Sequence, residues 1–206
     1  MHGYSDRISH ALAFSAKYYN SRIPRSAGMA YLAQPANVAV ILARYGADEA
    51  TVVAGILHHA LEETAEAAAV EDLRRKIADK FGPTILGVVL DAVEPRYDPR
   101  GRERPWRACK QEFLVHLAEA EPRALDICVA DEIQRCGWTG TMMRRLGVEY
   151  LRTVSHASVD QTLWWYRSMI EVLAGRAEWP RREMLDELRR MSAALIHDLR
   201  TNEEGA

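Results

Sequence analysis

The sequence predicts an all-α fold, a bundle of about eight to ten helices, on three observations. Apolar residues recur at the three- and four-residue spacing of a helix along nearly all of the 206 residues, and the strict alternation of a strand is absent. Proline, glycine and capping residues mark most boundaries between the periodic segments. The composition, 48% hydrophobic and 27% charged, is that of a globular protein with a sizeable core.

Three helices are expected early in the chain. Apolar residues at 8, 12 and 16 predict the first, and the proline, glycine and serine of residues 21–30 predict a loop after it. A second helix is expected from about Tyr31 to Tyr45, ending at Gly46. Asp48 is expected to cap the third helix, whose apolar stripe is wide enough to be deeply buried.

Helices of different length are expected in the middle of the chain. Residues 70–93 predict two short helices around Gly82 and Pro83, and residues 94–104 predict a loop with at most a short hairpin. Pro105 and Pro122 suit the first turns of two further helices. A long helix is expected over about 157–175, where the helical spacing resumes.

A last helix is expected after Pro180. Its apolar residues fall on one face: Met184, Leu188, Met191 and Leu195. A polar tail follows from Thr201. The apolar face favours packing on the same core, with a dimer contact as the alternative. Two regions are therefore predicted, a main domain over 1–178 and a C-terminal helix and polar tail over 179–206 that pack on it.

Charge and cysteine content exclude several classes of partner and compartment. The 27 basic and 29 acidic residues give a net charge of -2, which predicts no binding of duplex nucleic acid or anionic lipid but leaves room for a small anionic ligand. No apolar stretch reaches the ~18 residues of a membrane span, and no signal peptide is visible. Three cysteines without a paired motif indicate reduced, buried thiols. A cytoplasmic protein without membrane contact is expected.

The most unusual segment for chemistry runs from Leu57 to Thr64 within the third helix. Helical spacing places His58 near Glu62 and His59 near Glu63, because residues four apart share a face. Four ionisable groups in two turns of an otherwise apolar helix need partners. A divalent metal is one such partner, since imidazole and carboxylate together suit Mn, Fe or Zn. Two His–Glu pairs at a solvated helix edge are the alternative.

Several segments in a fixed order carry a resemblance to a known family. They are Tyr31 with Gln34, His58-His59, Glu62-Glu63, Ala130-Asp131 with Gln134-Arg135, Lys80 to Pro83, Arg104 to Arg107, and Gln161 to Ser168. In this order they resemble the HD-domain hydrolases of the RelA/SpoT-like superfamily, in particular the small alarmone hydrolases. The resemblance covers about residues 5–175. It implies that residues 1–178 form an HD-type hydrolase domain, an all-α bundle.

The resemblance implies a site and a reaction. In the family, two His and two Asp hold one divalent metal, usually manganese, and a Glu-Asp pair helps to activate the water that cleaves the 3′-pyrophosphate of (p)ppGpp. The implied metal positions here are Gln34, His58, His59 and Asp131. The implied catalytic residues are Glu62 and Glu63. The implied substrate-binding residues are Arg25, Tyr31, Arg107, Lys110 and Tyr166, of which the last could instead be core.

Departures from the family pattern gather at this site. Gln34 stands where the family has His, and His59 stands where it has Asp. Glu63 replaces Asp, and Glu132 and Arg135 replace Lys and Asn. Losing even indirect support of a ligand costs ~10–100-fold in metal affinity or activity. We therefore expect weak or absent metal binding, with manganese or another divalent metal as cofactor if the protein is active and none otherwise.

Three functions remain open at this point, and whether the chain is an enzyme is among the open questions. The first is a phosphohydrolase homologue resembling guanosine-3′,5′-bis(diphosphate) 3′-pyrophosphohydrolases, with altered ligands and weak or lost activity. The second is a nucleotide-sensing or regulatory pseudoenzyme, and the third is a helical protein-interaction module. The expected partner is a guanine nucleotide or another phosphorylated small molecule, and a homodimer is the expected assembly if there is one.

Overall fold

The computed structural model describes residues 4–19, 32–147 and 158–204, and these contain nine helices. The helices are α1 (Asp6–Tyr19), α2 (Ala33–Arg44), α3 (Glu49–Glu62), α4 (Ala67–Phe81), α5 (Pro83–Ala92), α6 (Trp106–Leu117), α7 (Pro122–Leu146), α9 (Val159–Gly175) and α10 (Arg182–Glu204). The one isolated β-bridge of these ranges joins Tyr97 and Glu103. The all-α prediction is therefore confirmed, with the bridge inside the loop where a short hairpin was allowed.

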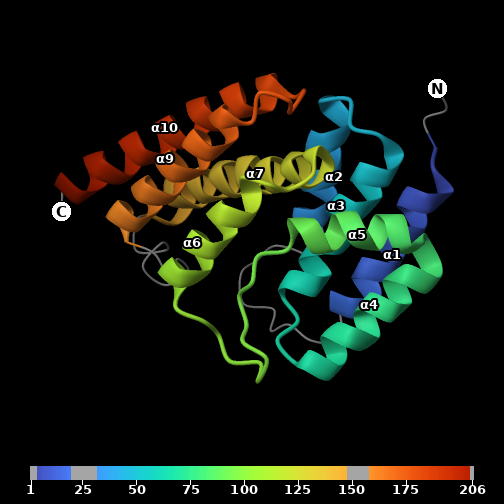
Figure 1. The fold of residues 1–206 in the computed structure, drawn as a ribbon. Coiled ribbons are helices and arrows are strands. Elements are labelled where there is room, and N and C mark those ends of the chain that lie inside the picture. Colours follow the sequence, from blue (N-terminus) through green and yellow to red (C-terminus); the bar gives the residue numbers. More distant parts are fainter. Residues whose placement is uncertain (1–3, 20–31, 148–157, 205–206) are drawn as a thin grey trace.

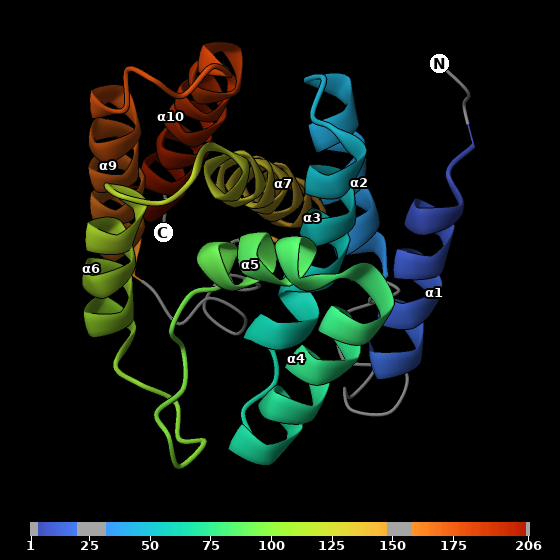
Figure 2. The same ribbon diagram turned by 45° about the vertical axis from the view of Figure 1, so that its right-hand side comes forward.

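The long helix α7 runs through the middle of the molecule (Figures 1 and 2). It packs against α2, α3 and α5 on one side and against α10 on the other. Helix α3 is the second centre, because it contacts α1, α2, α4, α5 and α7. Every residue of α3 from Thr51 to Glu62 is buried. Polar groups placed on α3 and α7 therefore face each other in the interior of the fold.

The start of α3 is fixed by the residues expected there. Asp48 caps the helix by accepting a hydrogen bond from the Thr51 amide at 2.8 Å, and its other oxygen lies 2.7 Å from Arg123 Nη2 at the start of α7. Gly46 has φ +73°, a backbone conformation that suits glycine after the end of α2. Gly55 lets α2 approach closely, because a Cβ there would lie 2.5 Å from Leu42 Cδ1.

Helix α10 packs against α7 and α9. The segment just before α10 is joined to α7 by two contacts with Asp126. The buried Trp179 donates from Nε1 to Asp126 Oδ1 at 2.8 Å, and Arg181 Nη1 lies 2.9 Å from Asp126 Oδ2. Of the predicted apolar face, Met184, Leu188 and Leu195 are buried and Met191 is partly buried, and Leu185 and Leu199 are buried as well. The helix continues through Thr201 to Glu204, beyond the point where a polar tail was expected to begin. The boundary at residue 178 stays a prediction.

Two further predictions can be compared with the described residues. Pro105 is the N-cap of α6 rather than a residue of its first turn. The three cysteines are buried free thiols, as expected. Within the described ranges, no helix has both the length and the apolar character needed to cross a membrane.

Candidate functional site

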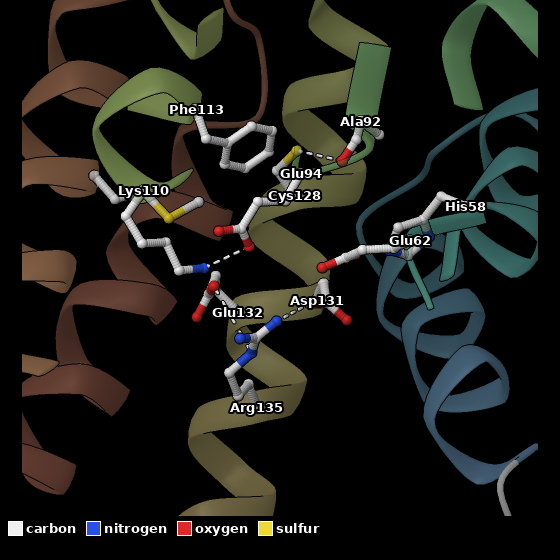
Figure 3. A pocket seen from close by; sticks show the side chains of 11 residues that line it. His58, Glu62, Ala92, Glu94, Lys110, Phe113, Cys128, Asp131, Glu132 and Arg135 are labelled. Atoms are coloured by element: carbon white, nitrogen blue, oxygen red, sulfur yellow. Dashed lines mark hydrogen bonds and ion pairs between the residues drawn. The ribbon is translucent and has the colours of Figure 1, made fainter. Parts of the chain in front are cut away.

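One small cavity lies where α3, α6 and α7 meet the segment that follows α5 (Figure 3). Its volume is about 20 Å³, which is room for a water molecule or a small ion and far too little for a nucleotide. The lining side chains include most of the charged groups of the interior: His58, Glu62, Glu94, Lys110, Asp131, Glu132 and Arg135, together with Ala92, Phe113, Cys128 and Met169. The cavity is therefore a small space lined mainly by charged side chains of the interior.

Three buried donors of α3 gather beside this cavity. Ligand atoms of His58, His59 and Glu62 all lie within 4.8 Å of one another. His58 Nδ1 lies 2.7 Å from the Gly55 carbonyl oxygen, which assigns the proton to Nδ1 and leaves the lone pair on Nε2. His59 Nδ1 lies 4.0 Å from Glu62 Oε2. Two imidazoles and one carboxylate are a donor type that divalent transition metals accept.

Burial sets the protonation of these three groups. It lowers the pKa of His58 and lowers the pKa of His59 to about 4, although nearby Asp131 opposes both shifts. Both imidazoles are therefore neutral near pH 7. Burial, with Asp131 and Glu94 adding repulsion, raises the pKa of Glu62 to about 8, so that this carboxyl group carries a proton near neutral pH.

Asp131 on α7 is held by two side chains of the protein itself. Gln34 Nε2 on α2 donates to Asp131 Oδ1 at 3.1 Å, and Arg135 Nη2 lies 3.0 Å from Asp131 Oδ2. Burial alone would raise the pKa of Asp131, but Arg135, the neighbouring histidines and the Gln34 hydrogen bond hold it below its ordinary value. Asp131 is therefore an ionised carboxylate with both oxygens already engaged.

The two carboxylates expected to be catalytic lie in different environments. Glu62 is buried, with Oε1 3.8 Å from Arg96 Nη1, whereas Glu63 is the half-buried C-cap of α3 and pairs closely with Arg96. The predicted proximity of His58 and Glu62 is confirmed, because their ligand atoms lie within 4.8 Å of each other, and His59 also lies beside Glu62, three residues on. Glu63 keeps a helical backbone as the C-cap of α3, and its side chain pairs with Arg96.

The three described residues expected at the substrate lie at different depths. Lys110 lines the cavity, with Nζ 2.7 Å from Glu94 Oε2 and 4.1 Å from the centre of the Trp165 ring. Arg107 is exposed and stacks on Trp164, with Cζ 3.1 Å from the ring centre, and it is not among the residues that line the cavity. Tyr166 is buried, and burial followed by the charge of Glu132 raises its pKa.

Sequence reasoning reached only part of this cluster. Arg25 and Tyr31, both expected at the substrate, lie outside the described residues. The structure adds two charged groups that were not expected at the site, Glu94 and Arg96, and it gives partners to Glu132 and Arg135, which were expected there only as replacements of family residues. The i,i+4 spacing of Asp131 and Arg135 was the one available signal for a pair in this group. Glu94 and Arg96 lie in a loop, whose position spacing cannot predict.

The described side chains do not fit the four-ligand metal site that the resemblance implies. His58 and His59 offer neutral imidazoles, but neither brings negative charge. The fourth position, Asp131, has a guanidinium on one oxygen and an amide on the other. Hydrogen bonding assigns the Gln34 nitrogen, not its carbonyl oxygen, to the side that faces Asp131. What remains is a three-donor cluster beside a protein cation.

The chain is similar to one family model and to several known proteins. The family model described as "HD domain" matches residues 11–134, more than half of the chain. A Streptomyces antibioticus protein named "GTP pyrophosphokinase" is 28% identical over 176 residues, which are 82% of this chain and 19% of that protein. An Aquifex aeolicus protein named "Guanosine-3′,5′-bis(diphosphate) 3′-pyrophosphohydrolase" is 31% identical over 85 residues, 41% of this chain and 12% of that protein. The chain thus spans a fifth or less of these relatives.

A solved structure resembles the whole fold. It is that of a metazoan ortholog of SpoT, which its description says hydrolyzes ppGpp. The TM-score is 0.66 with 19% sequence identity, and the match covers 92% of this chain and 97% of the other. At this identity the likeness concerns the arrangement of the helices.

Proposed function

Because this chain belongs to the HD domain family, we propose that it is a phosphohydrolase homologue directed at guanosine 3′,5′-bis(diphosphate) or a related phosphorylated nucleotide, with weak activity. The names of its relatives supply the substrate class. The polar cluster of α3 and α7 lies at the positions that the resemblance assigns to the site. The altered residues of that cluster supply the expectation of weak activity.

The observation that carries this proposal is the pair of hydrogen-bonding partners on Asp131. Gln34 donates to one carboxylate oxygen and Arg135 to the other, so a protein cation already offsets the negative charge that an incoming divalent ion would use. His59 adds a lone pair but no charge to offset that of the ion. A metal is therefore held weakly, and any reaction that depends on it is slow.

The substrate-binding surface is proposed around the mouth of the cavity. The cavity itself has no room for a nucleotide, so the guanine base and ribose must lie outside it. Arg107 is exposed next to Trp164 and can contact a phosphate without losing a partner carboxylate. Lys110 is paired with the buried Glu94, so its contact with phosphate requires that pair to open.

The test is release of pyrophosphate from guanosine 3′,5′-bis(diphosphate) with manganese present. We expect measurable but slow release, about 100-fold or more below that of a variant with the family ligand set. Asp131→Ala should abolish the release, because Asp131 is the ionised carboxylate of the cluster. Asp186→Ala, an exposed position on α10, is the matched control and should leave the rate unchanged.

A nucleotide-sensing protein without turnover is the second candidate. It is favoured by the same engagement of Asp131, since an ionised carboxylate with both oxygens bound does not require a metal. Thermal stabilisation by the nucleotide without any release of pyrophosphate would select this function. If the nucleotide is neither cleaved nor bound, both candidates are wrong. The expected homodimer and the cytoplasmic location stay predictions.

A further inference from the structure

The cavity contains more carboxylates than basic side chains. Four acidic residues line it, but Glu62 carries a proton near neutral pH, which leaves three carboxylates, Glu94, Asp131 and Glu132, against two basic side chains, Lys110 and Arg135. Lys110 is engaged by Glu94 at 2.7 Å. Among the lining residues, Arg135 is therefore the cation left for the two acidic residues of α7. Buried carboxylates without a compensating cation are strongly destabilising.

Arg135 is placed to serve both of these carboxylates. It lies one turn beyond Asp131 on α7, with Nη2 3.0 Å from Asp131 Oδ2 and Nε 3.8 Å from Glu132 Oε1. The Arg135 side chain is 40% exposed, whereas those of Asp131 and Glu132 are 8% and 5% exposed. Figure 3 shows the guanidinium reaching from one end of the cavity toward the space between the two carboxylates.

The second oxygen of Glu132 adds an independent observation. Glu132 Oε2 is buried and has no hydrogen-bond partner among the described residues. An acidic oxygen in this position relies on a nearby positive charge for its stability. The described cation within 4.0 Å of this carboxylate is Arg135. The buried negative charge of Glu132 therefore needs a positive charge nearby, and the Arg135 guanidinium supplies it.

We infer that the Arg135 guanidinium takes the electrostatic place of a divalent cation, so that the folded protein needs no metal at this cluster. The inference rests on the proposed function, which is the source of the expectation that a metal ion would bind at this cluster. Its consequence is specific: removal of the guanidinium should leave Asp131 and Glu132 uncompensated and create a demand for a divalent cation. Manganese should then stabilise the variant and not the natural protein.

The experiment compares thermal unfolding of variants of the 206-residue chain with manganese and with a chelator. Arg135→Asn, which installs the residue type that the family has here, should lower the Tm by roughly 5 °C in chelator. Saturating manganese should recover most of that loss. The natural protein should unfold at the same temperature in both conditions. Arg144→Asn is the matched control on the same helix, because Arg144 is exposed and its Nη2 lies 3.4 Å from the Thr141 hydroxyl rather than beside a carboxylate of the cavity.

Three results would overturn the inference. They are an Arg135→Asn variant as stable as the natural protein, a destabilised variant that manganese does not rescue, and equal stabilisation of the natural protein by manganese. If Arg135→Asn fails to fold, Arg135→Asn with Glu132→Gln removes one buried charge and should still bind manganese in a calorimetric titration. Because stability and metal binding are measured, failure here leaves the pyrophosphate-release test of the proposed function untouched.

Discussion

A double change of Gln34→His and His59→Asp is expected to raise the affinity for manganese on the order of 100-fold. The Gln34→His change replaces an amide that now donates to Asp131 with an imidazole that can ligate an ion. The His59→Asp change adds the negative charge that a neutral imidazole lacks. Isothermal titration with manganese measures the affinity directly, and adding Arg135→Asn should raise it further.

The control for this double change repeats both substitutions at exposed positions. Gln111→His on α6 and His197→Asp on α10 alter the composition identically and lie away from the residues that line the cavity. This control should leave manganese affinity at the level of the natural protein. An unaltered affinity in the Gln34→His, His59→Asp protein would mean that these two positions are not what limits metal binding.

Lys110→Ala is expected to lower the free energy of unfolding by about 3–5 kcal/mol. Lys110 and Glu94 are both buried, with Nζ and Oε2 2.7 Å apart, so truncation of the lysine leaves a buried carboxylate without its cation. The truncation also removes the ammonium group that lies over the Trp165 ring. Urea denaturation with linear extrapolation gives the free energy of each variant.

Two further variants separate the charge from the packing. Lys110→Met with Glu94→Gln removes both charges and should restore most of the stability, since replacing a buried pair with neutral groups is often close to neutral. Arg189→Ala breaks an exposed pair with Asp186 and should change the free energy of unfolding by less than about 1 kcal/mol. A similarly small effect of Lys110→Ala would contradict a structural role for its pair with Glu94.

The helices could be predicted because their signals are local. Asp48, Gly46 and Pro83 lie at helix ends where their backbone and side-chain preferences place them. The buried face of α10 follows from the spacing of its apolar residues. The helix α10 extends further than its sequence predicts, because polar residues in a final turn do not stop a helix in the way that Gly or Pro does.

The site was only partly predictable, since its charges pair through tertiary contacts. The unusual His and Glu content of α3 was visible in the sequence, and the resemblance supplied Asp131 from a distant helix. Glu94 meets Lys110 and Arg96 meets Glu63 because a loop without periodicity folds back over α3 and α6. Arg135 was visible as a residue that replaces the family's Asn, and its contacts with Asp131 and Glu132 came only from the structure.

The metal content of the natural protein most directly tests the claim that Arg135, and not a metal ion, supplies the positive charge beside Asp131 and Glu132. The 206-residue chain, purified without chelator, would be analysed for manganese, iron and zinc, with the Gln34→His, His59→Asp protein prepared in parallel. The engagement of Asp131 by Gln34 and Arg135 predicts well below one equivalent of metal in the natural protein and more in the variant. One tightly held equivalent in the natural protein would contradict the account, because an ion would then occupy the cluster in spite of Arg135.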